Sequence, residues 1–330
     1  MHQISKSWAL PLAAAFLAAA AFGLWAQNPA QLPPPPPDPG AEGELTFSTG
    51  TRLVVLYCGV FDRRGRMVTD LERAAFKVFE NNAEQQIRIF RQEDIPLSLG
   101  IVIDNSGSMR GKRSAVESAA VRLVKSSKRN DEVFVVNFND EAYLDVPFTA
   151  QMSKLEEGVA RIDSRGGTAL YDALSMSLDH LAAEGKRDKK VLLLISDGTD
   201  TASFSATAEK LIEKAQKSGA LIYSIGLLAD EDRREARRAK RFLDNLSKAS
   251  GAAAYYPDAI SEVDAVADQV AHDIRNQYVI AYSPQNQSLD GTYRQIKVTA
   301  GSRFTVRTRT GYYATPDEQP RRRPAAAPGE

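Results

Sequence analysis

The chain has 330 residues and balances 42 basic against 42 acidic side chains, so its formal net charge at pH 7 is zero. Its length exceeds that of one average domain, and a composition of 43% hydrophobic and 25% charged residues excludes a disordered or fibrous protein. The balanced charge also excludes a strong overall attraction to nucleic acid or to an anionic membrane, so binding must depend on a local site.

The first 44 residues are not typical of a packed domain. An apolar stretch from Trp8 to Trp25 follows Lys6 and predicts a secretory signal peptide over residues 1–26. The stretch is also close to the length of a membrane span, so an uncleaved anchor is the alternative. The proline-rich residues 27–44 predict an extended linker. We therefore expect an exported protein, periplasmic or extracellular, with no integral membrane span after cleavage of the signal peptide.

Residues 45–94 are predicted to form an N-terminal β segment. Runs rich in β-branched and aromatic residues alternate with turn residues, and they predict strands at 53–57, 76–80 and 86–91. Cys58 is the only cysteine and lies in an apolar run, so we expect a buried thiol and no disulfide.

Residues 95–276 alternate short apolar runs with helical patterns. Strands are predicted at 97–103, 132–138, 190–196, 221–227 and 252–255, and helices at 112–127, 169–183, 206–218, 234–249 and 261–276. The run 191–195 is apolar on both faces, as a strand between two layers of helices must be. With an antiparallel edge strand at 142–147, this pattern predicts a doubly wound, mainly parallel, Rossmann-like α/β domain.

Residues 277–314 return to strand patterns, at 278–282, 293–299 and 304–310. Neither β segment holds enough strands for a stable sheet of its own. We therefore predict that the two segments pair into a small β-sandwich, with the α/β domain inserted between them. Residues 315–330 are rich in Pro, Ala and Arg and predict a disordered tail.

Three polar loops are expected at the carboxyl edge of the predicted sheet. Asp104, Ser106 and Ser108 form an Asp-x-Ser-x-Ser loop, Thr168 follows two glycines, and Asp197 follows the strand at 190–196. Loops at this edge of an open α/β sheet are where ligands bind. Carboxylate and hydroxyl oxygens suit a hard cation such as Mg²⁺, so these five residues are the candidate metal ligands.

These loops, in this order, resemble the metal ion-dependent adhesion site of the von Willebrand factor type A family. The resemblance covers roughly residues 97–276, and flanking stretches such as 94–98 and 311–314 resemble those of bacterial exported relatives. It implies a non-enzymatic protein-binding or adhesion module. In such a module Asp104, Ser106, Ser108, Thr168 and Asp197 would hold Mg²⁺, or another divalent cation such as Mn²⁺. It also implies a protein partner that presents an Asp or Glu carboxylate, and a last helix, 261–276, that can shift as a switch.

Each loop alone has an ordinary structural explanation. Asp, Ser and Thr readily cap helices, so the Asp104 loop and Thr168 could simply begin the helices that follow them. Asp197 and the glycine after it could form a common turn. The occurrence of all three loops in one order favours the metal site.

Other functions lack a matching pattern. The loop 107–114 has the wrong spacing for a phosphate-binding loop, and His180 and His272 lie in predicted helices. The alternative function is a Mg²⁺-dependent hydrolase or phosphatase of the envelope, although the Asp104 loop offers serines where such enzymes use a second carboxylate or a lysine. The basic run 233–241 fits an exposed helix better than a nucleic-acid site. A purely structural envelope component is a third class, and the oligomeric state is not predicted.

Overall fold

The computed structural model describes residues 53–92, 94–161, 164–229 and 231–316, all within one compact unit. The predicted signal peptide, the linker and the tail beyond Pro316 lie outside the described residues. The expectations for those segments therefore stay predictions.

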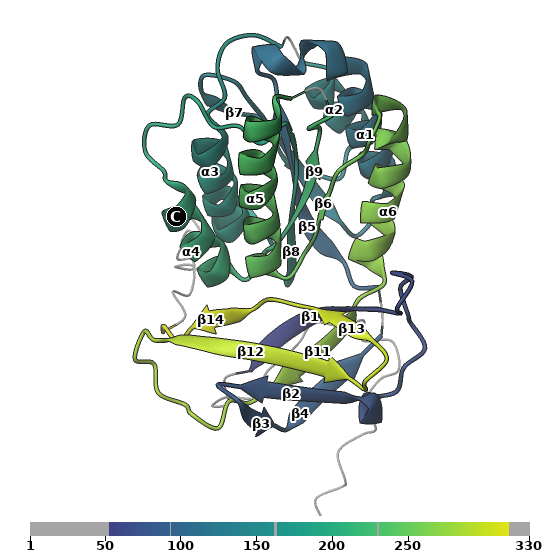
Figure 1. Cartoon of the computed structure of the whole chain (residues 1–330), viewed down its shortest axis with the longest axis vertical. Helices are drawn as coiled ribbons and strands as arrows, with labels where there is room; N and C mark the ends of the chain where they lie inside the picture. Colours follow the sequence, from purple (N-terminus) through teal and green to yellow (C-terminus); the bar gives the residue numbers. More distant parts are fainter. Residues whose placement is uncertain (1–52, 93, 162–163, 230, 317–330) are drawn as a thin grey trace, which may run out of the picture. The chain divides into compact units, whose positions relative to one another are not determined.

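The central sheet has six strands in the order β10-β9-β8-β5-β6-β7 (Figure 1). The strands are β5 (Leu97–Asp104), β6 (Glu132–Phe138), β7 (Ala142–Thr149), β8 (Lys189–Ser196), β9 (Leu221–Gly226) and β10 (Ala254–Tyr255). All neighbours are parallel except β7, which pairs antiparallel with β6 at the edge. This confirms the predicted doubly wound α/β fold, and it places β5 in the middle of the sheet.

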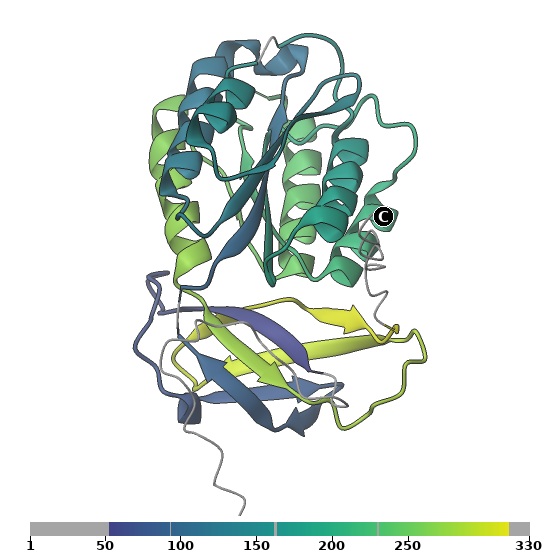
Figure 2. The ribbon, with the colours of Figure 1, turned by 180° about the vertical axis from the view of Figure 1, so that it is seen from behind.

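Helices cover both faces of this sheet, as Figures 1 and 2 show from opposite sides. They are α1 (Arg113–Ser126), α2 (Met152–Val159), α3 (Leu170–Glu184), α4 (Ala208–Ser218), α5 (Arg233–Ser250) and α6 (Val263–Arg275), with short 3-10 turns η1 (Arg73–Ala75), η2 (Gly107–Lys112) and η3 (Ile260–Glu262). One apolar core joins α1, α2 and α6 to the sheet, and a second joins α3, α4 and α5 to its other face. The strand run Val191–Ile195 contributes to both cores, because successive side chains of a strand point to opposite faces.

The remaining strands form two four-stranded antiparallel sheets, β13-β1-β11-β4 and β14-β12-β2-β3. They are β1 (Val54–Phe61), β2 (Phe76–Glu80), β3 (Ala83–Gln85), β4 (Ile87–Arg91), β11 (Tyr278–Tyr282), β12 (Tyr293–Ala300), β13 (Thr305–Arg307) and β14 (Gly311–Tyr313). Each sheet combines strands from before and after the α/β domain; Val54 of β1, for example, pairs with Tyr282 of β11. A single apolar core, which includes the buried Cys58, lies between strands of both sheets.

Two buried carboxylates of this framework are fully engaged by donors. Glu80, in the sandwich, accepts hydrogen bonds from the hydroxyls of Tyr282 at 2.7 Å and Tyr312 at 3.0 Å, and it pairs with Arg294 at 3.4 Å. Asp131, just before β6, accepts from the main-chain nitrogen of Leu97 at 3.0 Å and from the guanidinium of Arg275. Such pairing offsets the cost of removing a carboxylate from water.

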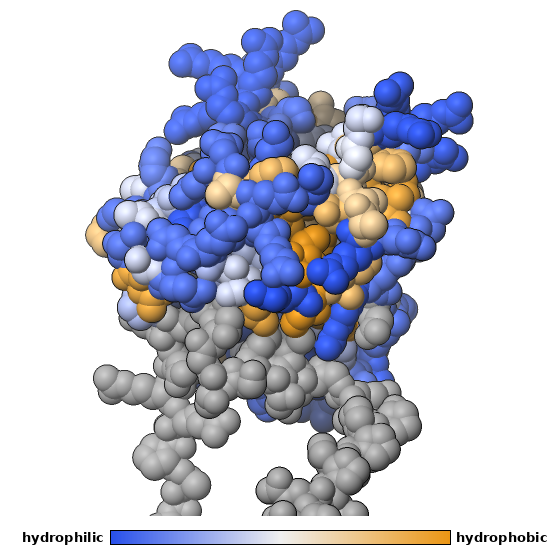
Figure 3. Space-filling view, turned by 90° about the horizontal axis from the view of Figure 1, so that it is seen from below, coloured by the Kyte–Doolittle hydropathy of each residue, from blue (hydrophilic) through white to orange (hydrophobic). Residues whose placement is uncertain are grey.

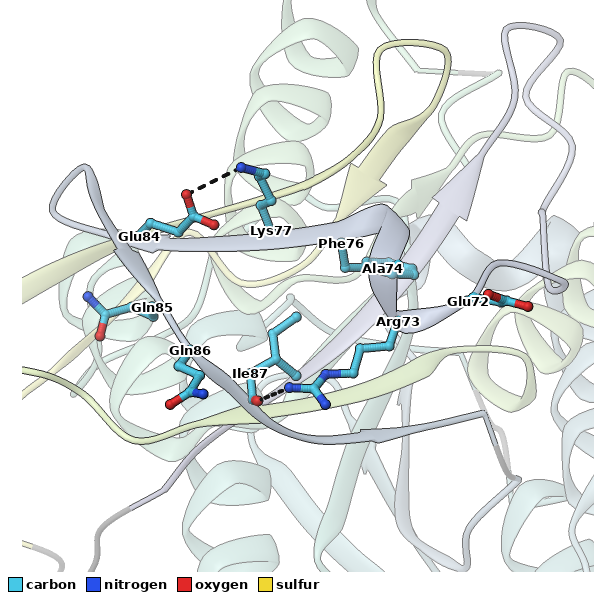
Figure 4. A pocket seen from close by; sticks show the side chains of 9 residues that line it. All are labelled: Glu72, Arg73, Ala74, Phe76, Lys77, Glu84, Gln85, Gln86 and Ile87. Carbon is cyan, nitrogen blue, oxygen red and sulfur yellow. Dashed lines mark hydrogen bonds and ion pairs between the residues drawn. The ribbon is translucent and has the colours of Figure 1, made fainter.

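A hollow of about 630 Å³ opens on the sandwich, lined by residues of η1, β2, β3 and β4 (Figure 4). Three of its charged side chains, those of Arg73, Lys77 and Glu84, already have partners. Lys77 bonds Glu84 at 3.4 Å, and Arg73 donates to the main-chain oxygen of Ile87 at 2.6 Å. The surface seen from below the view of Figure 1 is mainly hydrophilic, with apolar side chains in patches (Figure 3). We assign no function to this hollow, because most of its charged groups are already paired.

Candidate metal centre

Asp104 ends the central strand β5 and is completely buried. One oxygen of its carboxylate accepts from the main-chain nitrogen of Ser106 at 2.9 Å, and the other accepts from the hydroxyl of Ser196 at 2.6 Å. Ser196 ends β8, and its hydroxyl in turn accepts from the main-chain nitrogen of Gly198 at 2.9 Å. The ends of two adjacent strands are therefore tied together through Asp104, which fixes the position of its carboxylate.

The two serines of the first loop face one another. The hydroxyl oxygens of Ser106 and Ser108 lie 3.0 Å apart, with Ser106 buried and Ser108 exposed. Ser106 is the residue before η2, but its side chain makes no capping hydrogen bond within the described residues. The structure therefore does not support a helix-capping role for this hydroxyl, and it leaves the pair at the surface end of the Asp104 loop.

The loop that carries Thr168 lies directly beside the serine loop. The main-chain nitrogen of Gly107 donates to the oxygen of Gly166 at 3.1 Å. Gly166 has φ +75°, and a Cβ atom there would lie 2.1 Å from Asp140, so a side chain at this position would be both strained and crowded. Thr168 itself is buried, and α3 begins after it at Leu170 without a side-chain cap in the described residues. Capping therefore does not account for Thr168 either.

Asp197 brings a second buried carboxylate to this edge. Both of its side-chain oxygens are buried and lack a hydrogen-bond partner among the described residues. The ammonium of Lys112 lies 4.0 Å away, but it is bonded to the main-chain oxygen of Leu227 at 3.0 Å and to Glu231 at 2.9 Å. A buried carboxylate without a well-formed hydrogen bond is costly, and the nearby Ser108 hydroxyl and Lys112 ammonium offset that cost only in part.

The two aspartates also perturb each other. Burial and the nearby negative charge of Asp197 raise the pKa of Asp104 to about 7. Burial and the charge of Glu231 raise the pKa of Asp197, while the Ser108 hydroxyl and Lys112 oppose that rise. Two neighbouring carboxylates that are difficult to ionise at the same time need more positive charge close to them, and a cation would supply it.

The donor set fits a divalent cation with a preference for oxygen. Within the described residues, no three His, Cys, Asp or Glu side chains converge on one point. Any cation here would therefore depend on hydroxyl groups as well as on the two aspartates. Asp104, Ser106, Ser108 and Asp197 supply such groups, and the loop of Thr168 adjoins them. Small, hard cations such as Mg²⁺ accept mixed sets of this kind together with water.

Sequence reasoning missed a second polar feature next to Asp104. A hollow of about 200 Å³ is lined by Asn105, Asn137, Asp145, Arg161 and Arg165, among others. The side-chain oxygens of Asn105 and Asn137 are buried and have no partner among the described residues. Only the folded sheet shows this hollow, because Asn137 is the second-last residue of β6 while Asn105 follows β5.

The remaining candidates take structural positions. His180 packs in α3 against the rings of Phe134 and Phe148, and His272 lies in α6. The basic run predicted at 233–241 forms the start of α5 and exposes most of its arginines to solvent. Among the described residues, no helix is both long and apolar enough to cross a membrane.

Comparison with known proteins confirms the family resemblance for the central domain. Residues 99–199 match the family model of the von Willebrand factor type A domain. An uncharacterized protein of Synechocystis is 31% identical over 108 residues, and inter-alpha-trypsin inhibitor heavy chain H4 of Sus scrofa is 29% identical over 117 residues. Each match covers 32% of this chain, and they cover 26% and 13% of those two proteins.

Solved structures of this family resemble the chain more distantly. A von Willebrand factor type A protein from Catenulispora acidiphila is 14% identical with a TM-score of 0.47, covering 82% of this chain and 76% of that one. The von Willebrand factor domain of the type V pili tip protein Mfa5 from Porphyromonas gingivalis is 15% identical with a TM-score of 0.45. That match covers 55% of this chain and 95% of the Mfa5 chain.

Proposed function

We propose that the von Willebrand factor type A-like domain of this chain is a protein-binding, adhesion-type module that uses a divalent cation to hold a partner's carboxylate. Asp104, Ser106, Ser108, Thr168 and Asp197 would hold the cation, Mg²⁺ or Mn²⁺. The observation that carries the proposal is the buried carboxylate of Asp197, which has no hydrogen-bond partner among the described residues and stands beside Asp104. A divalent cation would satisfy both aspartates at once.

The charges explain why an acidic partner suits this site. If both aspartates reach the cation largely through water, as the family resemblance implies, the direct ligands are hydroxyls and water, which carry no charge and leave the cation short of negative charge. A bound cation would supply a positive centre with room for an anionic oxygen. Ser196 and the main chain of Ser106 fix the carboxylate of Asp104 from behind, while the exposed Ser108 lies on the side open to a partner.

An enzyme that uses a metal remains the alternative function. The sequence suggested that no second carboxylate or lysine stands in the Asp104 loop, but the structure brings both Asp197 and Lys112 close to it. Lys112 is nevertheless committed to Leu227 and Glu231, so its ammonium is not available to a substrate. Turnover of a phosphate or carboxylate ester by the wild type that disappears in Asp104→Ala would replace our proposal with this alternative.

Calorimetric titration with MgCl₂ tests the cation site directly. We expect one site in the wild type and an affinity at least about 100-fold lower, roughly 2.7 kcal/mol, in Asp104→Ala. Ser106→Ala removes one hydroxyl and no charge, and should weaken binding about 10-fold. Glu141→Gln is the control, since Glu141 is an exposed acid at the same edge outside the proposed ligand set. Equal Mg²⁺ affinity in the wild type and Asp104→Ala would end the proposal.

Partner binding is tested separately with an envelope extract from the cells that make this protein. We expect proteins retained by the immobilised wild type in Mg²⁺ to be released by EDTA and to be absent with Asp104→Ala. Retention that does not depend on the metal would contradict a carboxylate held through a cation.

A further inference from the structure

A second feature of the same edge is an aromatic side chain held out in solvent. Among the described residues, six large hydrophobic side chains are exposed: Tyr143, Leu144, Phe204, Ile260, Leu289 and Tyr293. Phe204 is 97% exposed, about twice the value of any other in this set. It lies in the loop between β8 and α4, the same loop that begins with Asp197 (Figure 1).

This loop is fixed by the start of α3. The carboxylate of Asp172 accepts from the main-chain nitrogens of Phe204 at 2.7 Å, Ser205 at 3.1 Å and Ala206 at 2.8 Å. The hydroxyl of Ser203 accepts in turn from the main-chain nitrogen of Asp172 at 3.0 Å. The exposure of Phe204 is therefore a property of an organised loop, and little backbone entropy would be lost when a partner covers it.

The loop also adjoins the candidate metal ligands. The hydroxyl of Thr201 accepts from the main-chain nitrogen of Thr168 at 3.0 Å, and the main-chain nitrogen of Ala202 donates to the oxygen of Thr168 at 3.1 Å. One residue, Ser203, separates Ala202 from Phe204. The aromatic ring and the candidate metal site therefore belong to one continuous surface.

Charged side chains of both signs are exposed near that surface, and the acids Asp140 and Glu141 lie beside the Thr168 loop. Arg110 lies in η2 and Arg113 begins α1, directly after the Ser106–Ser108 loop, and both are exposed. Surface charge on this side therefore does not by itself select an acidic partner, and that preference follows from the proposed cation.

We infer that Phe204 is the apolar anchor of the docking surface, and that the partner is a protein carrying an Asp or Glu side chain beside an apolar pocket that receives the ring. The claim that the partner carries an Asp or Glu rests on the proposed function. The claim that it has an apolar pocket rests on Phe204 alone. Aromatic residues that become fully buried dominate the binding energy of many protein interfaces, whereas the contacts around them contribute little.

Photo-crosslinking in the cells that make the protein tests the inference. The photoreactive analogue p-benzoyl-phenylalanine replaces Phe204 in the full chain, and in a matched control it replaces Leu289, an exposed residue of the sandwich. We expect a crosslink from position 204 that is absent from position 289 and disappears with EDTA. The crosslinked peptide, mapped by mass spectrometry, should contain apolar residues with an Asp or Glu nearby.

Affinity for the mapped partner then separates the two proposals. Phe204→Ala should weaken binding at least about 10-fold and leave Mg²⁺ affinity unchanged, while Phe204→Trp should stay within about threefold of the wild type. Because Phe204 contributes almost nothing to the core, its substitution should not lower the melting temperature. A partner that binds through the metal with equal affinity to wild type and Phe204→Ala would overturn this inference alone. If Asp104→Ala still bound every partner of the wild type, that result would overturn the proposed function instead.

Discussion

Buried carboxylates occur in two settings in this chain, and their surroundings differ. Glu80 of the sandwich receives two tyrosine hydroxyls and an arginine. Asp197 of the α/β domain is equally buried, but its oxygens have no hydrogen-bond partner among the described residues. The first arrangement is complete as it stands, whereas in the second the Lys112 ammonium lies 4.0 Å from Asp197 and is bonded to Leu227 and Glu231. A carboxylate that serves the fold can thus be distinguished from one that awaits a ligand by its partners rather than by its burial.

The largest expected effect on stability comes from a substitution at Glu80, the buried carboxylate whose partners are all in place. Glu80→Gln removes the charge that balances Arg294, whose side chain is almost fully buried. We expect the free energy of unfolding to fall by about 3–5 kcal/mol, the usual cost of removing one member of a buried ion pair, because the half-exposed Asp290 at 3.7 Å replaces Glu80 only in part. Urea denaturation measures it. Glu84→Gln, which removes one member of an exposed pair with Lys77, is the control and should have little effect.

The pH dependence of stability should come next in size. An unfolded Asp ionises near pH 3.9, whereas burial and Asp197 raise the pKa of Asp104 in the folded chain to about 7. Between these values the folded state binds more protons than the unfolded state, so stability should fall as pH rises from about 4 to 7. We expect a loss of about 3 kcal/mol in EDTA, since one pKa unit corresponds to about 1.4 kcal/mol.

Asp104→Asn should remove this loss, and so should saturating Mg²⁺ at pH 7. Urea titrations at intervals of one pH unit would show it. A stability that rises with pH over this range in the metal-free wild type would contradict the assignment of a raised pKa to Asp104.

The smallest expected effect on stability is at Asp197, where the substitution should stabilise the fold rather than destabilise it as at Glu80. Asp197→Asn makes the same kind of change, but at a carboxylate with no hydrogen-bond partner among the described residues, and we expect about 1 kcal/mol of stabilisation in EDTA. Addition of Mg²⁺ should then stabilise the wild type and leave the variant unchanged, because only the wild type would bind it. Thermal unfolding with and without Mg²⁺ measures both. Destabilisation by Asp197→Asn would show that the Asp197 carboxylate, like that of Glu80, stabilises the fold, and would contradict this comparison.

The α/β core was predictable from the sequence because its strands are apolar on both faces. The run Glu132–Phe138 forms β6 with the predicted bounds, and β5, β8 and β9 differ from prediction by one residue at one end. Helix α2 was missed, since it buries little more than Leu155 and Val159 and is otherwise polar. Strands β3 and β14 were missed because three residues show no periodicity.

The candidate site was predictable only in part. Its ligand loops stand in the sequence as a recognisable pattern, and the structure places them side by side. The hydrogen bond from Ser196 to Asp104 joins residues 92 positions apart, and the bond from Lys112 to Leu227 joins residues 115 apart. No local pattern encodes such pairs. The same holds for the exposure of Phe204, which depends on Asp172 in another element.

The order of the strands in the sandwich also determines when it can assemble. β1 and β2 are made before the α/β domain, but their ladder partners β11 and β12 follow it in the chain. The first β segment must therefore wait, with unpaired edges, until nearly the whole chain has been synthesised. Pairing across so long an intervening sequence is slow, and waiting edges are prone to associate with other chains. The sandwich is thus the last part to close, and a chain cut short before residue 277 would leave those early strands open to aggregation.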